Sequence, residues 1–393
     1  MKKHLGWMIR MLIAALGVAY ILYTLTWTDK VWLPPGYTAY EQVSGGEHGR
    51  AFEIYEERND AYWIGFYPDP GASRISYRAW IDKSELGTGH DQPQFKPSFL
   101  TIVRQADAKL LLLGGLLFIP IVLLATLRWW RLMRARGIDV GPGRVGRLTL
   151  AGYFFNLCMP GTTGGDVMKA FYAAKGTQQR ADAVVSIAID RLCGLVGLVL
   201  LVGIIGLLSL DDPLIRKLTI AMWCGLFTLF AFAWLYTSPT LRSRLKLGAK
   251  LGNLPGAKII RNLDTWVTAY RRHLGTLAAA IGLSVVIHIC LASAMSLAGF
   301  AMGVDQPMLY LLGVIPIVLM LWSLPVSGPL GLGPLDYVAV QLVVANSATT
   351  DQQAVMMFVA FRLYLVAVGL AGSLAMLGLG AKPDTAPEAV PEN

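Results

Sequence analysis

The sequence predicts an all-α polytopic membrane protein with a small β-rich insertion outside the membrane. Hydrophobic residues make up 55% of the 393 residues, charged residues only 15%, and the mean hydropathy is +0.52. A soluble chain of average composition carries about 25% charged residues. The apolar residues also occur in blocks that lack Asp, Glu, Lys and Arg, and most blocks are long enough for a helix to cross a bilayer core. These blocks are 11–28, 110–127, 192–210, 218–241, 274–304, 306–335 and 363–381.

The net charge of +9 is distributed as in a membrane protein rather than a nucleic-acid-binding protein. Basic residues cluster beside the hydrophobic blocks, as the positive-inside rule predicts for cytoplasmic loops. One cluster follows the second block and contains Arg128, Arg131, Arg134, Arg136, Arg144 and Arg147, with Trp129 and Trp130 as interfacial anchors. The other fills 238–273, where Asp264 is the only acid. Both clusters predict a polybasic surface that contacts anionic headgroups.

The first element, residues 1–27, is predicted to be a retained transmembrane span. Lys2, Lys3 and Arg10 precede its apolar run. A cleavable signal peptide is the alternative, but no small-x-small cleavage site follows. We therefore expect the N-terminus inside, and residues 28–108 outside.

Residues 28–108 are predicted to form a β-rich extracytoplasmic insertion. The segment holds twelve acidic and eight Lys or Arg residues, which is consistent with translocation. Alternating runs around 52–55 and 62–66, separated by Arg58-Asn59-Asp60, predict a hairpin. Its aromatic residues are expected to form a small core or rest on the membrane interface.

A proline, glycines and a carboxylate interrupt the helical pattern at 156–166. The number of spans before each basic loop decides on which side of the membrane that loop lies, and this charge parity decides whether the segment crosses the membrane or turns back. If 148–159 were a full span, the basic stretch 238–273 would lie outside, against the positive-inside rule. If the segment instead dips in and returns through 166–178, both basic clusters stay cytoplasmic. We therefore predict a re-entrant helix pair with Pro160 to Gly165 at its tip, since broken backbone at membrane depth is tolerated only inside protein or along a cavity.

A second break of the same kind lies at 325–336, after the apolar run Leu309 to Leu324. By parity it enters from outside, and the last span, about 354–380, places the acidic tail 381–393 inside. The prediction is about six full spans plus two Gly/Pro-broken re-entrant pairs. Paired broken segments in two halves indicate an inverted repeat with a site near the midplane.

Residues 156–176 resemble the signature of the lysylphosphatidylglycerol synthase transmembrane domain, a flippase-like family of integral membrane proteins. Three further stretches agree in order: the run from Asp190 to Leu195, the turn from Pro325 to Asp336, and a final helix with Arg362. The resemblance covers about 109–380. It implies translocation of a phospholipid or lipid-linked glycan. No aminoacyltransferase domain follows residue 380, so lysyl transfer is not expected, and the 28–108 insertion is longer than the usual first loop.

The candidate headgroup-binding residues are charged or glycine residues at the two breaks and within the apolar helices. Gly164 and Gly165 at a helix N-terminus are expected to form an anion cradle, although a tight turn alone also needs glycines. Asp166 is interpreted either as a helix cap or as a partner of Lys169, and Arg191 either as snorkelling to the interface or as facing an inward site. Arg362 needs an anion, which is Asp336, Asp190 or a lipid phosphate. The full set is Asn156, Pro160, Gly161, Gly164, Gly165, Asp166, Lys169, Asp190, Arg191, Gly331, Gly333, Asp336 and Arg362.

The functional prediction is a flippase-like transporter of the cytoplasmic membrane, with both termini cytoplasmic. The chain lacks a Walker A sequence and a Rossmann fingerprint, and Cys158, Cys193, Cys224 and Cys290 lie in apolar segments without metal-ligand spacing. No catalytic residue, cofactor, metal or nucleic-acid partner is therefore expected. His288 is interpreted as an interhelical hydrogen-bond partner rather than a proton relay. The alternatives are a non-transporting envelope scaffold that binds a protein partner through 28–108, and a membrane transferase that uses a polyprenyl-phosphate donor.

Overall fold

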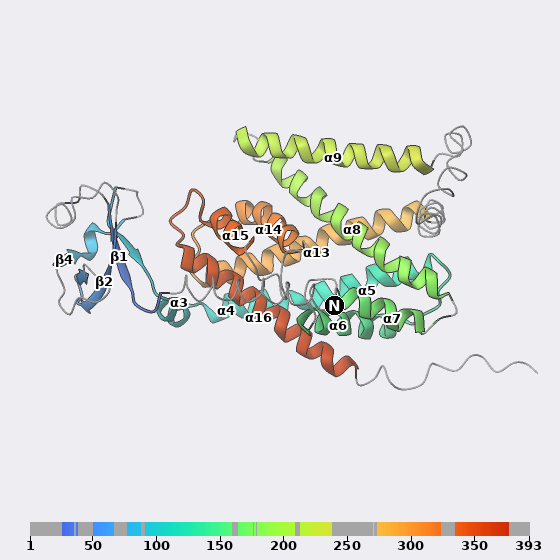
Figure 1. The fold of residues 1–393 in the computed structure, drawn as a ribbon, viewed down its shortest axis with the longest axis horizontal. Coiled ribbons are helices and arrows are strands. Elements are labelled where there is room, and N and C mark those ends of the chain that lie inside the picture. The colour runs from blue at the N-terminus through green and yellow to red at the C-terminus, as the bar shows by residue number, and fades with distance from the viewer. Residues whose placement is uncertain are drawn as a thin grey trace, which may run out of the picture.

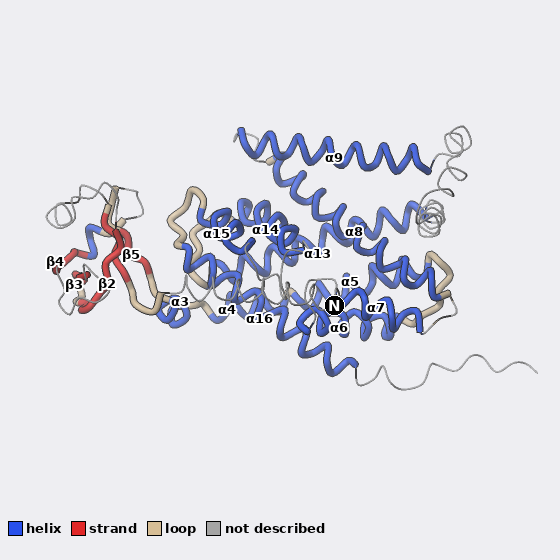
Figure 2. Tube along the Cα trace, viewed as in Figure 1, coloured by secondary structure: helices blue, strands red, loops and turns tan. Residues whose placement is uncertain are grey.

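The computed structural model describes an elongated helical body with a small β-sheet at one end (Figures 1 and 2). The residues described are 26–34, 37, 50–66, 77–87, 91–158, 164–175, 177, 179–208, 213–237, 270, 273–323 and 335–376. The predicted first span and the predicted tail 381–393 lie outside these residues, apart from Thr26 and Trp27.

The sheet confirms the predicted β-rich insertion. Its five antiparallel strands lie in the order β4-β3-β2-β1-β5, and the predicted hairpin is β2 paired with β3. One face carries a small core that includes Phe52, Ile64 and Ile81. On the rim, Glu57 accepts a hydrogen bond from Lys83 at 2.7 Å, which raises the pKa of Lys83. The strands are β1 Lys30–Leu33, β2 Arg50–Glu57, β3 Ala61–Phe66, β4 Tyr77–Asp82 and β5 Gln94–Lys96.

The helical body begins directly after β5, because α3 packs against the long helices rather than against the sheet. Ile102 on α3 contacts Ala298 and Met356 in one buried cluster. Asp29, just before β1, accepts hydrogen bonds from the Ser98 amide and from the Thr101 hydroxyl, and so ties sheet and helix together. The helices are α3 Phe99–Gln105, α4 Ala108–Leu116, α5 Phe118–Arg134, α6 Pro142–Cys158, α7 Gly164–Lys175, α8 Arg180–Leu207, α9 Pro213–Thr237, α13 Leu274–Ala301, α14 Met308–Ser323, α15 Leu335–Val344 and α16 Asp351–Met376.

Four of the six predicted spans correspond to helices that are long and apolar enough to cross a membrane. These are α4 with α5, α8, α13 and α16, with lengths of 26 to 28 residues. The predicted span at 217–237 coincides with α9, of which Thr219–Ala231 is apolar. The count of six remains a prediction because the first span lies outside the described residues.

The long helices alternate in direction, and two helical hairpins lie between them (Figure 1). α5 and α16 run away from the β-sheet, whereas α8 and α13 run toward it. Seven residues separate the end of α5 from the start of α6, and α7 ends a few residues before α8, so this hairpin leaves from and returns to the end far from the sheet. α14 follows α13 and α15 precedes α16, so the second hairpin leaves from and returns to the sheet end. Both hairpin tips, 159–163 and 324–334, fall outside the described residues.

Glycines allow α6 to lie unusually close to α16. A side chain on Gly372 would overlap the carbonyl oxygen of Leu150, and one on Gly369 would overlap Leu157. The first helix of one hairpin is thereby packed against the last helix of the chain. Such small-residue contacts are the usual means of close helix approach in membranes.

We predict that Gly372→Ala destabilises the protein by about 1–3 kcal/mol, because the added methyl group must displace the α6 backbone. Gly282→Ala, inside α13, is the matched control, since a Cβ there meets nothing within 4 Å. The control should be neutral or stabilising by about 0.5–1 kcal/mol. Thermal unfolding of the purified proteins in detergent measures both, and equal melting temperatures would contradict the close contact.

Candidate functional site

A buried ion pair joins α5 to α8 in the half of the body away from the sheet. Arg128 donates from Nε to Asp190 Oδ1 at 2.7 Å and from Nη2 to Asp190 Oδ2 at 3.0 Å. Its third donor, Nη1, reaches Ser284 Oγ on α13 at 2.7 Å. Both charged side chains are 11% exposed. One guanidinium therefore holds three helices together through a bidentate, charge-assisted contact.

A second ion pair lies next to the first and joins α7 to α8. Asp166, in the first turn of α7, accepts a hydrogen bond from Arg191 Nε. The side chain of Arg191 is 47% exposed and that of Asp166 is 19% exposed. Asp190 and Arg191 are adjacent in sequence but bind different partners, because neighbouring residues on a helix point about 100° apart. Asp190 turns inward to α5, while Arg191 turns toward α7.

Lys169 adds a positive charge to these two pairs. Its charged neighbours are Asp166, Asp190, Arg191 and Arg128, and its ammonium lies 5.4 Å from the ring centroid of Trp129. Among the described residues, no carboxylate oxygen lies within 4.0 Å of the Lys169 ammonium; Asp190 and Asp166 pair with Arg128 and Arg191 instead. The cluster thus contains three cations and two carboxylates. Counted over these five side chains alone, the formal charge is +1.

The start of α7 is packed too tightly for its glycines to serve as an open anion cradle in this conformation. The Gly165 amide donates to Asn156 Oδ1 on α6 at 2.7 Å, so it is already occupied. A side chain on Gly165 would overlap the carbonyl oxygen of Gly152. Gly164 is buried beside it. Asn156, Gly164 and Gly165 therefore position Asp166 and Lys169, and Pro160 and Gly161 lie outside the described residues.

The second break carries an ion pair of its own. Arg362 on α16 donates from Nη2 to Asp336 Oδ1, at the start of α15, and both residues are buried. The guanidinium carbon of Arg362 lies 4.2 Å from the ring centroid of Trp322 on α14. Of the three candidate anions expected for Arg362, the structure pairs it with Asp336. The predicted Gly331 and Gly333 lie outside the described residues.

Sequence reasoning missed Arg128, Ser284 and Trp322, and placed Trp129 wrongly. Trp129 is 1% exposed and donates to Ser186 Oγ at 3.0 Å, so it is a core residue rather than an interfacial anchor. The one available signal was that Arg128 is the first charge after an apolar block. His288 contacts the Gly194 carbonyl on α8 through Nε2 at 3.0 Å, as expected of an interhelical partner.

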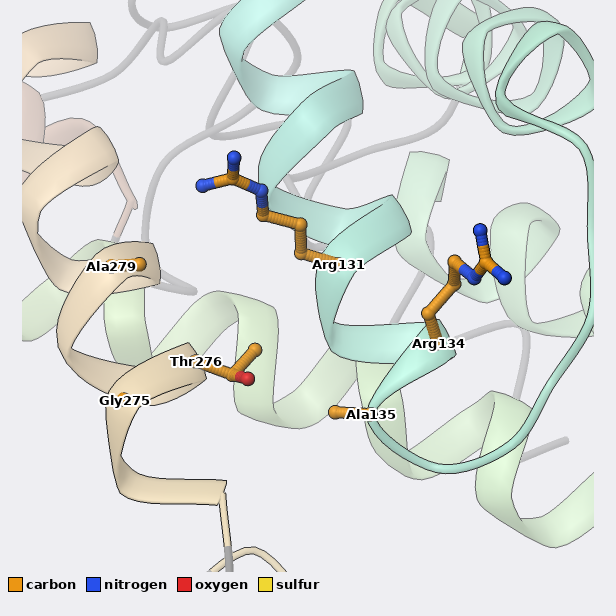
Figure 3. Close-up of a pocket in the computed structure, with 6 residues that line it drawn as sticks. All are labelled: Arg131, Arg134, Ala135, Gly275, Thr276 and Ala279. Atoms are coloured by element: carbon orange, nitrogen blue, oxygen red, sulfur yellow. The ribbon is translucent and has the colours of Figure 1, made fainter.

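An open basic pocket lies at the end of the body away from the sheet, between the end of α5 and the start of α13. It has a volume of about 420 Å³. Figure 3 shows that its lining combines small residues of α13 with two arginines of α5, and that Arg131 and Arg134 point in different directions. The lining residues are Arg131, Arg134, Ala135, Gly275, Thr276 and Ala279. Among the described residues no group of three or more His, Cys, Asp and Glu residues could hold a metal ion.

Long apolar helices and charged groups paired between them define this chain as a multi-pass membrane protein. The family model for the lysylphosphatidylglycerol synthase transmembrane region matches residues 97–372. The chain belongs to that family, as the motifs at 156–176 and 325–336 indicated. Comparison with curated proteins and with solved structures gave no match.

We predict that Asp190→Asn destabilises the protein more than the double variant Arg128→Gln/Asp190→Asn does. The single change leaves the Arg128 charge buried without its carboxylate, a loss of about 3–5 kcal/mol, whereas the double change removes both charges. Asp182→Asn is the matched control on the same helix, because its partner Arg136 forms a more exposed pair at 2.7 Å. Its effect should be smaller, about 1 kcal/mol or less. Thermal unfolding in detergent ranks the three variants, and a double variant less stable than Asp190→Asn would contradict the pairing.

Proposed function

We propose that the protein moves the phosphate-bearing headgroup of a phospholipid or lipid-linked glycan across the cytoplasmic membrane. The observation that carries the proposal is the cluster of Arg128, Lys169, Arg191, Asp166 and Asp190, whose cations outnumber its carboxylates by one. A phosphate diester carries the single negative charge that would neutralise the cluster. Arg and Lys are the side chains that proteins use for phosphate recognition.

The position of Arg191 supports passage of a lipid rather than of a water-soluble anion. Arg191 follows Arg180, the first residue of α8, by eleven residues, which corresponds to about 17 Å along the helix. That distance reaches roughly halfway through a hydrocarbon core of about 30 Å. A half-exposed arginine at this depth is costly unless it lines a polar path. Leu192 and Leu195 beside it are also about half exposed, so a headgroup at Arg191 leaves its acyl chains next to apolar side chains.

In this proposal the end of the helical body away from the sheet faces the cytoplasm, and the arginines gathered there support this orientation. The ends of α5, α7 and α9 and the starts of α6, α8 and α13 meet there, together with Arg131, Arg134, Arg136, Arg144 and Arg147. Positive charge in short loops marks the cytoplasmic side. The α6–α7 hairpin is then a re-entrant pair from the cytoplasm and the α14–α15 hairpin one from outside, with both termini cytoplasmic. The pocket at Arg131 and Arg134 offers anionic headgroups a first contact.

On this proposal the protein is a transporter and not an enzyme, and its partner is the lipid itself. The β-sheet lies at the extracytoplasmic end, where it is placed to receive the lipid or an envelope protein. The membrane potential contributes roughly 2.3 kcal/mol per elementary charge per 100 mV to the movement of a charged headgroup.

We predict that Lys169→Gln slows transport of a fluorescent phosphatidylglycerol in reconstituted vesicles about tenfold or more. The change removes the cation that gives the cluster its excess charge, and one charge-assisted contact to phosphate is worth about 1.5–3 kcal/mol. Lys175→Gln is the matched control, since Lys175 lies on the same helix but outside the cluster and is exposed. The control should transport at the parent rate.

Transport at the parent rate by Lys169→Gln would refute this site. Removing residues 28–96 then separates transport from scaffolding, since α3 and all later helices are retained. A scaffold would lose its partner while lipid movement continued unchanged, whereas a protein that moves no lipid in any form would favour the scaffold alone.

A further inference from the structure

The two ion pairs at the helix breaks occupy equivalent positions in the two hairpin units. In each unit an apolar helix ends in a Pro/Gly break, a carboxylate stands in the first turn of the next short helix, and an arginine follows in the next long helix. Asp166 and Arg191 are 25 residues apart, and Asp336 and Arg362 are 26 residues apart. Each arginine is the twelfth residue of its long helix, α8 from Arg180 and α16 from Asp351.

The two units also run in opposite directions. α8 begins at the end away from the sheet and α16 begins at the sheet end (Figure 1). Each arginine therefore lies about 17 Å from the start of its own helix, counted from opposite ends of the body. Equivalent residues at matching depths from the two sides are what an inverted repeat produces.

The two ion pairs differ in how much of their side chains is exposed, and we call the exposed pair open and the buried pair closed. The Asp166–Arg191 side chains are 19% and 47% exposed, whereas the Asp336–Arg362 side chains are 3% and 7% exposed. In transporters built from inverted repeats, the two repeats adopt unlike states in each conformation of an alternating-access cycle. In this conformation the first pair is open and the second is closed.

The closed pair has an unused hydrogen-bond donor beside it. Trp322 is 4% exposed, and its buried indole Nε1 donor has no acceptor among the residues that the structure describes. The same ring lies against the guanidinium of Arg362. An unsatisfied buried N–H group costs about 1–3 kcal/mol, so it indicates a ligand or a second conformation that supplies an acceptor. Trp322 and Arg362 together present donors only, which suits the oxygens of a phosphate group.

We propose that Trp322 and Arg362 form a second phosphate half-site, the counterpart of the site at Arg191, which Asp336 closes in this conformation. The inference rests on the proposed function. A headgroup phosphate replaces the Asp336 carboxylate on Arg362 and accepts the Trp322 indole N–H when the α14–α15 unit opens. The phosphate thus passes from the cluster at Arg191 to the half-site at Arg362, and one carboxylate–arginine pair re-forms as the other opens.

The test is the Trp322→Phe variant, reconstituted in phosphatidylcholine vesicles that contain fluorescent phosphatidylglycerol. Phe keeps an aromatic ring under Arg362 and removes the N–H donor together with part of the indole ring, and we expect transport to fall about tenfold. The lost ring volume lowers the melting temperature, and the removal of the unsatisfied donor offsets part of that loss. Trp223→Phe is the matched control: it removes the same atoms, its indole donates to the Gly203 carbonyl at 3.2 Å between α9 and α8, and it belongs to neither half-site, so transport should be unchanged.

A second variant guards against effects on folding. Arg362→Gln/Asp336→Asn removes both buried charges together and avoids an unpaired one. We expect it to fold and to lose transport at least tenfold. Parent-rate transport by both Trp322→Phe and this double variant, with Lys169→Gln still defective, overturns the second half-site and leaves the proposed function standing. Parent-rate transport by Lys169→Gln instead overturns the proposed function.

The source of the phosphate is distinguished by competition. Inorganic phosphate at millimolar concentration should not slow transport of the fluorescent lipid if the half-site takes a headgroup whose acyl chains stay in the bilayer. Competition by inorganic phosphate that disappears in Trp322→Phe would assign the half-site to free phosphate and overturn its role in lipid passage.

Discussion

The helical body depends on one constraint: a charge placed between apolar helices needs an opposite charge on another helix. Arg128 with Asp190, Arg191 with Asp166 and Arg362 with Asp336 each satisfy it by joining different helices. Breaking such a pair on one side leaves a charge in a medium that cannot solvate it. The pairs therefore fix which helices are neighbours, as well as what the surfaces between them can bind.

Several features of the fold followed from local pattern alone. Apolar blocks without charge gave four of the membrane-crossing helices, alternation around 52–66 gave the β2–β3 hairpin, and the Pro/Gly/Asp motifs gave the position of both breaks. These are short-range properties, since helix length, strand alternation and turn chemistry are set within a few residues. Charge parity predicted that the two hairpins point in opposite directions. Their re-entrant character within a membrane remains a prediction.

The contacts between residues of the site could not be predicted from the sequence in the same way. Arg128 looked like one more flanking arginine, yet its carboxylate partner lies 62 residues and its hydroxyl partner 156 residues further along the chain. Trp129 was interpreted as an interfacial anchor and Trp322 drew no prediction, because only packing shows that the Trp129 indole has an acceptor and that the Trp322 indole has none among the described residues. Periodicity assigns residues to elements, but pairing across elements depends on how the helices cross.

The glycine contact between α6 and α16 gives the body a mechanical property. The Leu157 side chain of α6 fills the space that Gly369 leaves on α16, and Gly372 lets the Leu150 carbonyl approach the α16 backbone. Closely packed helices move by shear, in which one element slips along another by small steps without losing contact. Because α16 belongs to one hairpin unit and α6 to the other, such a slip couples their motions directly. In the proposed transport cycle, the two hairpin units would therefore move together rather than as two independent gates.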